Sequence, residues 1–202
     1  MKKARSRNRK RWQLILLALL FAAPLVASLS LYYGGWRPAP KAKGDLITPA
    51  RAITDVELRA LDGTPARFSS LKGKWSLVYF GPADCREECQ RALYVLRQVH
   101  IAQHKNTPRV QRVFILLEER GLDRLPATLK EYQPVTVLRA GRAGIDQLVA
   151  QFAIDGRPRP AGEARIYVVD PLGNVVLHYG PERPPGLINK DLYRLLRVSR
   201  VG

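Results

Sequence analysis

Residues 75–80 (WSLVYF) form a nearly continuous apolar run, and this run limits the fold more than any other segment. A strand whose successive side chains are apolar is covered on both faces, like the central strand of a sheet between helices. Directly after it, apolar residues recur every three to four positions, at Cys85, Cys89, Leu93, Leu96 and Val99. The sequence therefore predicts a buried strand followed by a helix from Cys85 to about residue 104, with Asp84 as its N-cap.

The other predicted elements surround this strand and helix. A hairpin precedes them, with strands at residues 53–60 and 66–68 joined by the turn Asp62-Gly63. Further strands are predicted at 109–118, 135–138, 165–169 and 174–179, and further helices at 122–132, at 144–152 and after an N-cap at Asn189. This order predicts the α/β class, with a thioredoxin-like mixed sheet flanked by helices and an N-terminal β-hairpin.

The N-terminal segment differs in composition from this domain. Residues 1–11 contain seven Lys and Arg and no acid, and they run directly into the mainly apolar residues 14–31. As a helix, these 18 residues would span roughly 27 Å, against about 30 Å for the hydrocarbon core of a bilayer. Tyr32, Tyr33 and Trp36 follow, where interfacial aromatic residues are expected. The segment is therefore predicted to be one transmembrane helix.

This interpretation divides the chain into four parts. Residues 1–13 are a cytoplasmic basic tail, 14–33 the transmembrane anchor, 34–51 a Pro-rich linker and 52–202 the thioredoxin-like domain. The positive tail stays in the cytoplasm, so the domain is predicted to lie in the periplasm, on a bacterial inner membrane. A cleaved signal peptide with a break after Ser28 is the alternative. The apolar run continues past that position, which favours the anchor.

The net charge of +17 does not by itself indicate a nucleic-acid-binding protein. Seven of the positive charges lie in the tail, and the others are scattered among acidic residues. Blocks of like charge and interleaved aromatic residues, which single-strand-binding surfaces use, are missing after residue 11. We expect no nucleic-acid partner, and a basic surface that faces an anionic membrane.

Cys85 and Cys89 are the only cysteines, and their position suggests chemistry. Cys85 is predicted where a central strand gives way to a helix, so the unpaired N–H groups of the helix would lower the pKa of its thiol. Residues i and i+4 of a helix lie about 6 Å apart, which suits a disulfide or a shared soft metal ion. Core packing and a structural disulfide remain alternatives. A disulfide in so short a loop stabilises a fold less than one closing a long loop, which favours a redox role.

Three longer segments of the chain match the pattern of a known family. Residues 68–75 (FSSLKGKW) and the following SLVYFGPADCREEC are similar to dLkGKvvLvyFGyTxCPxxCP, the pattern of the Sco (synthesis of cytochrome c oxidase) family. LDRLPATLKEY (122–132) is similar to RDTPEVLKEY, and RIYVVDPLGNVVLHYG (165–180) to the hairpin YLIDPDG. The resemblance covers nearly all of residues 53–198. It implies a thioredoxin-like fold, copper binding through two Cys and one His, and a role in building the CuA centre of cytochrome c oxidase.

The sequence departs from this pattern at the metal ligands. The family's ligand His lies eight residues before the Asp of the DP turn, and that position is Gly162 here. Arg86 and Gln90 replace the two prolines of CPxxCP. His178, on the last strand, is the candidate substitute, so the predicted metal ligands are Cys85, Cys89 and His178, with Cu(I) as the metal. His100 and His104 are expected to be surface residues far along the cysteine helix.

We therefore predict a membrane-anchored, Sco-like assembly factor for cytochrome c oxidase. Cys85 and Cys89 would act by thiol-disulfide exchange, with transient handling of Cu(I), on an oxidase subunit or another assembly factor. The alternative is a non-catalytic docking protein that keeps the thioredoxin-like fold. A peroxidase of the peroxiredoxin type is disfavoured, because Pro82 stands where those enzymes usually have Thr.

Overall fold

The computed structural model describes residues 3–34, 44–153 and 164–199. The chain divides into two compact units, Met1–Lys41 and Ala42–Gly202. Within residues 3–34 the first unit forms the helix α1 (Lys3–Tyr33), with Pro24 in its interior. Its segment Arg11–Leu31 is long and apolar enough to cross a membrane, and a signal sequence has the same properties. The predicted transmembrane segment, residues 14–33, falls almost entirely within it.

The second unit is built on a mixed sheet that, within the described residues, contains eight strands in the order β1-β8-β7-β4-β5-β6-β2-β3. The strands are β1 (Asp45–Ala52), β2 (Glu57–Ala60), β3 (Pro65–Arg67), β4 (Trp75–Pro82), β5 (Val110–Glu118), β6 (Thr136–Arg139), β7 (Ile166–Val169) and β8 (Asn174–Tyr179). The predicted hairpin is confirmed as β2 and β3, which pair antiparallel.

Strand β4 is central, as its apolar run predicts. It pairs parallel with β5 on one side and antiparallel with β7 on the other. Seven of its eight residues are buried, because side chains of both faces are covered. Leu77 and Tyr79 point into one core cluster, while Val78 and Phe80 point into the other.

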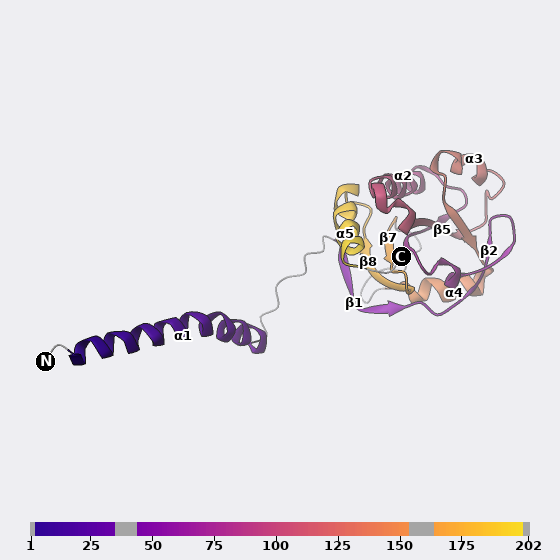
Figure 1. The fold of residues 1–202 in the computed structure, drawn as a ribbon. Helices are drawn as coiled ribbons and strands as arrows, with labels where there is room; N and C mark the ends of the chain where they lie inside the picture. Colours follow the sequence, from indigo (N-terminus) through magenta and orange to yellow (C-terminus); the bar gives the residue numbers. More distant parts are fainter. Residues whose placement is uncertain (1–2, 35–43, 154–163, 200–202) are drawn as a thin grey trace. The chain divides into compact units, whose positions relative to one another are not determined.

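Helices cover both faces of the sheet, which gives three layers. On one face lie α2 (Glu87–Ile101), α3 (Leu125–Leu129) and α5 (Pro185–Val198), whose apolar residues share a cluster with Leu77. The opposite face is covered by α4 (Arg142–Gln151) and the segment around the short helix η1 (Phe68–Leu71). Figure 1 shows α2 and α3 on one side of the sheet and α4 on the other. The short helices η2 (His104–Arg109) and η3 (Lys130–Tyr132) follow α2 and α3.

The structure corrects the expected start of the domain. Residues 45–52 were expected in the linker 34–51 or at its border, but they form β1, which pairs antiparallel with β8 at the edge of the sheet. Most residues of β1 are exposed, so the strand lacks the alternation of apolar and polar residues that identifies a half-buried strand. Its interior Pro49 is tolerated because an edge strand leaves N–H groups of one side unpaired.

Two predicted helix caps were wrong. Helix α2 begins at Glu87 with Arg86 as its N-cap residue, so Asp84 lies outside the helix. Helix α5 begins at Pro185, and Asn189 lies inside it. Proline is favoured in the first turn of a helix, where its missing N–H has no intrahelical partner. The side chain of Asn189 instead accepts a hydrogen bond from the buried Gln103 amide, a contact from α5 to the end of α2.

Candidate functional site

Cys85 and Cys89 form a disulfide at the junction of β4 and α2. Their Cα atoms are 5.1 Å apart, within the range that a disulfide requires. Cys85 lies two residues before the helix begins, and Cys89 is the third residue of the helix. The predicted pairing of the two sulfurs is therefore present, at the predicted strand-to-helix position.

Backbone hydrogen bonds fix the segment between the strand and the helix. The Ala83 N–H donates to the Glu118 carbonyl at 2.9 Å, which ties the segment to the end of β5. The Cys85 N–H donates to the Ala83 carbonyl at 2.8 Å. The Gln90 side-chain amide donates to the Cys85 carbonyl at 3.0 Å. Gln90 thus holds Cys85 against the first turn of α2 from within the helix.

The loop after β5 packs against the same segment. A Cβ on Gly121 would lie 3.3 Å from the Cα of Asp84, so only glycine allows this approach without displacement. Gly121 also has a φ of +84°, which favours glycine. The Asp84 carboxylate accepts a hydrogen bond from Arg86 Nε at 2.9 Å. Asp84 therefore stabilises the turn before the helix rather than capping the helix.

Both cysteines are largely buried. Cys85 is 7% exposed and Cys89 3%, and both belong to the core cluster beneath α2. The ring of Tyr79 lies against Gly81 in the same cluster, where a Cβ on Gly81 would meet the ring at 2.8 Å. Burial raises the pKa of Tyr79 to about 12, with a smaller contribution from the charge of Glu88. Cys85 is the more exposed of the two residues.

His178 lies on the opposite face of the sheet from the cysteines. On β8 its neighbours Leu177 and Tyr179 point into the cluster that contains Cys85, so His178 points the other way. Its ring centroid is 6.2 Å from that of Tyr167, a residue of the other cluster. Its Nε2 is 3.8 Å from Asp45 Oδ2. The structure therefore does not bring His178 together with Cys85 and Cys89.

The structure corrects the expectation for one of the other two histidines. His100 is buried rather than a surface residue, and its Nε2 is 3.0 Å from the Val110 carbonyl oxygen. Burial lowers the pKa of His100, and the nearby charge of Arg112 lowers it further. His104 is exposed, as expected, with a φ of +48°. His100 lies in the last turn of α2 and His104 begins η2, both at the far end of the helix from the disulfide.

Residues 75–199 match a protein family described as "Transmembrane-like, thioredoxin-like, C-terminal domain". This is more than half of the 202 residues. The chain belongs to this family. No curated protein matches it significantly.

Solved structures of Sco proteins have the same fold as this chain. Bradyrhizobium japonicum ScoI with copper bound is 24% identical, with a TM-score of 0.56, and the match covers 71% of this chain and 98% of that one. Yeast Sco1 with copper bound is 17% identical, with a TM-score of 0.62, covering 74% and 94%. BsSco, a member of the Sco family of cytochrome c oxidase assembly proteins in which a disulfide switch was identified, is 16% identical, with a TM-score of 0.60, covering 77% and 99%. The predicted fold is confirmed.

The donor atoms of the described residues do not fit the metal site that the Sco resemblance implies. Among these residues, no group of three or more His, Cys, Asp or Glu side chains is placed to hold a metal ion. Cys85 and Cys89 contribute two sulfurs, and these are joined to each other. Gly162, at the expected position of the third ligand, lies outside the described residues and has no side chain that coordinates a metal.

A groove of about 560 Å³ lies beside the first turns of α2, and sequence reasoning missed it. We call it the α2 groove. It is bounded by one side of α2, the start of β7 and the segment 180–185 (GPERPP) between β8 and α5. Its lining residues come from distant parts of the sequence, 87–95 and 164–188, so no local pattern indicates it. In the sequence, only the prolines of 180–185 indicate that this border of the groove is rigid.

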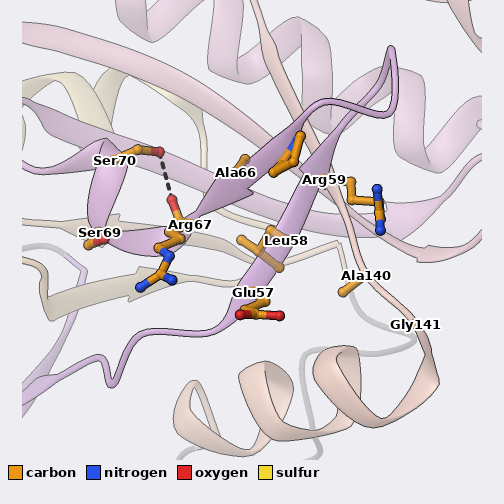
Figure 2. A pocket seen from close by; sticks show the side chains of 10 residues that line it. Glu57, Leu58, Arg59, Ala66, Arg67, Ser69, Ser70, Ala140 and Gly141 are labelled. Carbon is orange, nitrogen blue, oxygen red and sulfur yellow. Dashed lines mark hydrogen bonds between the residues drawn. The ribbon is translucent and has the colours of Figure 1, made fainter.

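A larger cavity, of about 700 Å³, lies away from the cysteines at the β2–β3 hairpin and the start of α4. Figure 2 shows the side chains that line it, among them Glu57, Arg59 and Arg67. Arg59 donates to the Gly63 carbonyl, and Arg67 lies 3.8 Å from Asp55, so both guanidinium groups have contacts within the hairpin region. The cavity is lined by no Cys or His, and we do not assign it the chemistry of the cysteine pair.

Proposed function

We propose that this protein reduces a disulfide of a partner by thiol-disulfide exchange at Cys85 and Cys89, and that it thereby assists the assembly of cytochrome c oxidase. The observation that carries the proposal is the Cys85–Cys89 disulfide at the junction of the central strand and α2. A two-residue redox couple at such a junction can open and close without disturbing the sheet. The Sco fold and the disulfide switch of BsSco support the proposal.

The exchange starts from the dithiol form. The Cys85 thiolate attacks one sulfur of the partner's disulfide, forms a mixed disulfide and releases the other partner sulfur as a thiolate. The Cys89 thiolate then attacks the Cys85 sulfur and releases the second partner sulfur. The Cys85–Cys89 bond forms, two electrons pass to the partner, and its two thiolates take up the protons that Cys85 and Cys89 gave up. A dithiol reductant returns the pair to its starting state.

The two cysteines have different roles because their surroundings differ. Cys85 is the more exposed, at 7% against 3%, so a partner reaches it first. It also precedes the N-terminus of α2, whose unpaired N–H groups and positive dipole end stabilise a thiolate. Cys89 lies within the helix, where the partner has less access but the Cys85 sulfur is in reach. Cys85 is the attacking sulfur and Cys89 the resolving one.

The partner is a cysteine-containing subunit of the oxidase or another assembly factor, and its reduced cysteines can then take copper. The proposed place of reaction is the periplasm, with α1 in the inner membrane and the basic tail in the cytoplasm. The chain's own reduced sulfurs could hold Cu(I) transiently, since thiolates are soft ligands that favour it. The thiol-disulfide exchange step does not require bound Cu(I).

Trapping of the mixed disulfide tests the proposed exchange. The full-length chain in neutral-detergent micelles is reduced, freed of reductant and mixed with 2-hydroxyethyl disulfide, and adducts are measured by mass spectrometry. Cys89→Ser should accumulate an adduct on Cys85, while Cys85→Ser should form far less, because Cys89 is the more buried sulfur. Equal, negligible labelling of both variants would overturn exchange. Cells that assemble the oxidase equally well with Cys85→Ser would support the docking alternative instead.

A further inference from the structure

We propose that the α2 groove binds a partner segment in which the reactive cysteine is accompanied by a basic residue and by apolar side chains. This inference rests on the proposed exchange at Cys85 and Cys89 and specifies the class of polypeptide that is reduced. The groove is preformed, and its volume of about 560 Å³ falls within the usual range of ligand sites.

The groove and the cysteine pair share the first turn of α2. Glu87 and Glu88, the first two residues of α2, line the groove, and Cys89 follows Glu88 directly. Its apolar lining includes Ala92, Ala164, Ile166 and Ile188, which belong to the same buried cluster as both cysteines. A segment whose cysteine reaches Cys85 would therefore lay its neighbouring residues in the groove, where apolar side chains leave water.

The rim formed by residues 180–185 is rigid and rich in hydrogen-bond acceptors. Pro181, Pro184 and Pro185 have fixed φ angles and no N–H group. Two of the remaining N–H groups near this rim are used internally, from Arg183 to the Gly180 carbonyl and from Leu187 to the Pro184 carbonyl. The rim therefore offers mainly carbonyl oxygens. An occupant that supplies N–H donors matches it.

The charged residues of the groove also favour an occupant with N–H donors. Glu87 pairs with Arg91 at 2.8 Å, and Glu182 pairs with Arg183 at 3.5 Å. Glu88 is exposed and has no ion-pair partner among the residues that the structure describes. A guanidinium or ammonium group of the occupant can pair with it, and charge-assisted hydrogen bonds of this kind are stronger than neutral ones. Glu88 directly precedes Cys89 in the first turn of α2, so this acidic group is carried by the same turn as the proposed resolving cysteine.

A preference for a basic occupant is the opposite of what the net charge of the whole chain predicts. The two effects can therefore be told apart by experiment. At a net charge of +17, long-range attraction speeds the approach of acidic peptides. At about 0.15 M salt, charges beyond roughly 8 Å are largely screened, whereas a contact with Glu88 persists. Faster reaction of a basic peptide must therefore come from a local site.

The experiment compares three capped heptapeptides that differ in one residue. Each contains a cysteine joined by a disulfide to 2-mercaptoethanol, two leucines, and Arg, Gln or Glu next to the cysteine. Rates of reaction with the reduced full-length chain in neutral-detergent micelles are measured at about 0.15 M salt and divided by the rate with 2-hydroxyethyl disulfide. We expect the Arg peptide to react about fivefold faster than the Glu peptide, as one exposed ion pair allows. Glu88→Lys should reverse the order.

Glu131→Lys is the matched control, since it makes the same charge change at an exposed residue of η3 outside the groove. It should leave the ratio of the Arg to the Glu peptide unchanged. Equal rates for the three peptides, or faster reaction of the Glu peptide with wild type, would overturn the inference and leave the exchange proposal standing. Failure of every disulfide, including 2-hydroxyethyl disulfide, would overturn the proposed function itself. A dimer in analytical ultracentrifugation that Glu88→Lys dissociates would assign the groove to a second copy of the chain and also refute the inference.

Discussion

Gly121 lies directly against Asp84, so that a Cβ on Gly121 would be 3.3 Å from both the Cα and the Cβ of Asp84. This contact joins the loop after β5 to the segment that carries Cys85. Asp84 directly precedes Cys85, so we expect a change at Gly121 to affect the cysteine pair through Asp84.

Gly121→Ala should destabilise the fold and loosen the contact between the loop after β5 and the segment that carries Cys85. The positive φ alone costs a residue with a side chain about 1–2 kcal/mol, and the added methyl group pushes against Asp84. We expect dithiothreitol to reduce the disulfide several-fold faster than in wild type. Gly73→Ala is the control, because Gly73 has a φ of +91° but no atom within 4 Å of its added Cβ. Equal reduction rates in the two variants would show that the Gly121 contact does not shield the sulfurs.

Tyr79→Phe should remove part of the loss of stability at alkaline pH. The raised pKa of Tyr79, about 12 in the folded chain, means that the unfolded chain releases this proton first as the pH rises. The stabilisation is complete below pH 10, the ordinary value, and is lost as the pH approaches the folded value. At pH 11 wild type should have lost roughly 1 kcal/mol more than Tyr79→Phe, relative to pH 8. Urea unfolding at both pH values measures this.

Tyr193→Phe is the control for that measurement, since Tyr193 is an exposed tyrosine of α5. Its unfolding free energy should follow that of wild type across the same pH range. If Tyr79→Phe also ran parallel to wild type, Tyr79 would ionise no later in the folded chain than in the unfolded one. The burial of its hydroxyl would then be disproved.

Asp191→Ala should cost about 1–3 kcal/mol of unfolding free energy. The buried carboxylate accepts hydrogen bonds from the Tyr179 hydroxyl at 3.1 Å and from the Gly44 N–H at 2.8 Å. Burial, and then the charge of Asp191, raise the pKa of Tyr179. Removal of the carboxylate leaves these donors without their acceptor, at the point where the second unit begins. Urea unfolding at pH 8 measures the loss.

Asp146→Ala provides the comparison for Asp191. Asp146 forms an exposed pair with Arg142 one turn earlier on α4, and exposed pairs contribute little. We expect a change within about 0.5 kcal/mol. Comparable losses in the two variants would mean that the Asp191 contacts contribute no more than a surface ion pair.

Local pattern was enough to predict the centre of the fold and the cysteine pair. Strand β4 and the buried face of α2 stand out because burial on both faces, or on one face of a helix, leaves a regular apolar spacing. The i, i+4 spacing of Cys85 and Cys89 likewise suggested a disulfide, although the turn before α2, rather than the helix, carries Cys85. These features depend on neighbours in the sequence.

The features that were missed depend on contacts between distant segments. Strand β1 is an exposed edge, and it is a strand because β8 lies beside it rather than because of its own residues. Alternation predicts that His178 points away from Leu177, but which face carries the cysteine helix is decided by the packing of α2 and α5. The burial of His100 likewise comes from its position over Val110 of β5.

His178→Ala should leave the affinity of the reduced chain for Cu(I) unchanged, because His178 lies on the face of the sheet opposite Cys85 and Cys89. Replacement of both cysteines by serine should lower that affinity by at least tenfold, since the soft sulfur ligands are removed. Competition with a coloured Cu(I) chelator measures both, on the full-length chain in micelles. His104→Ala, at an exposed site, controls for weak binding by surface imidazole. A tenfold loss with His178→Ala alone would mean that His178 reaches the sulfurs, and the separation of the two faces would then be wrong.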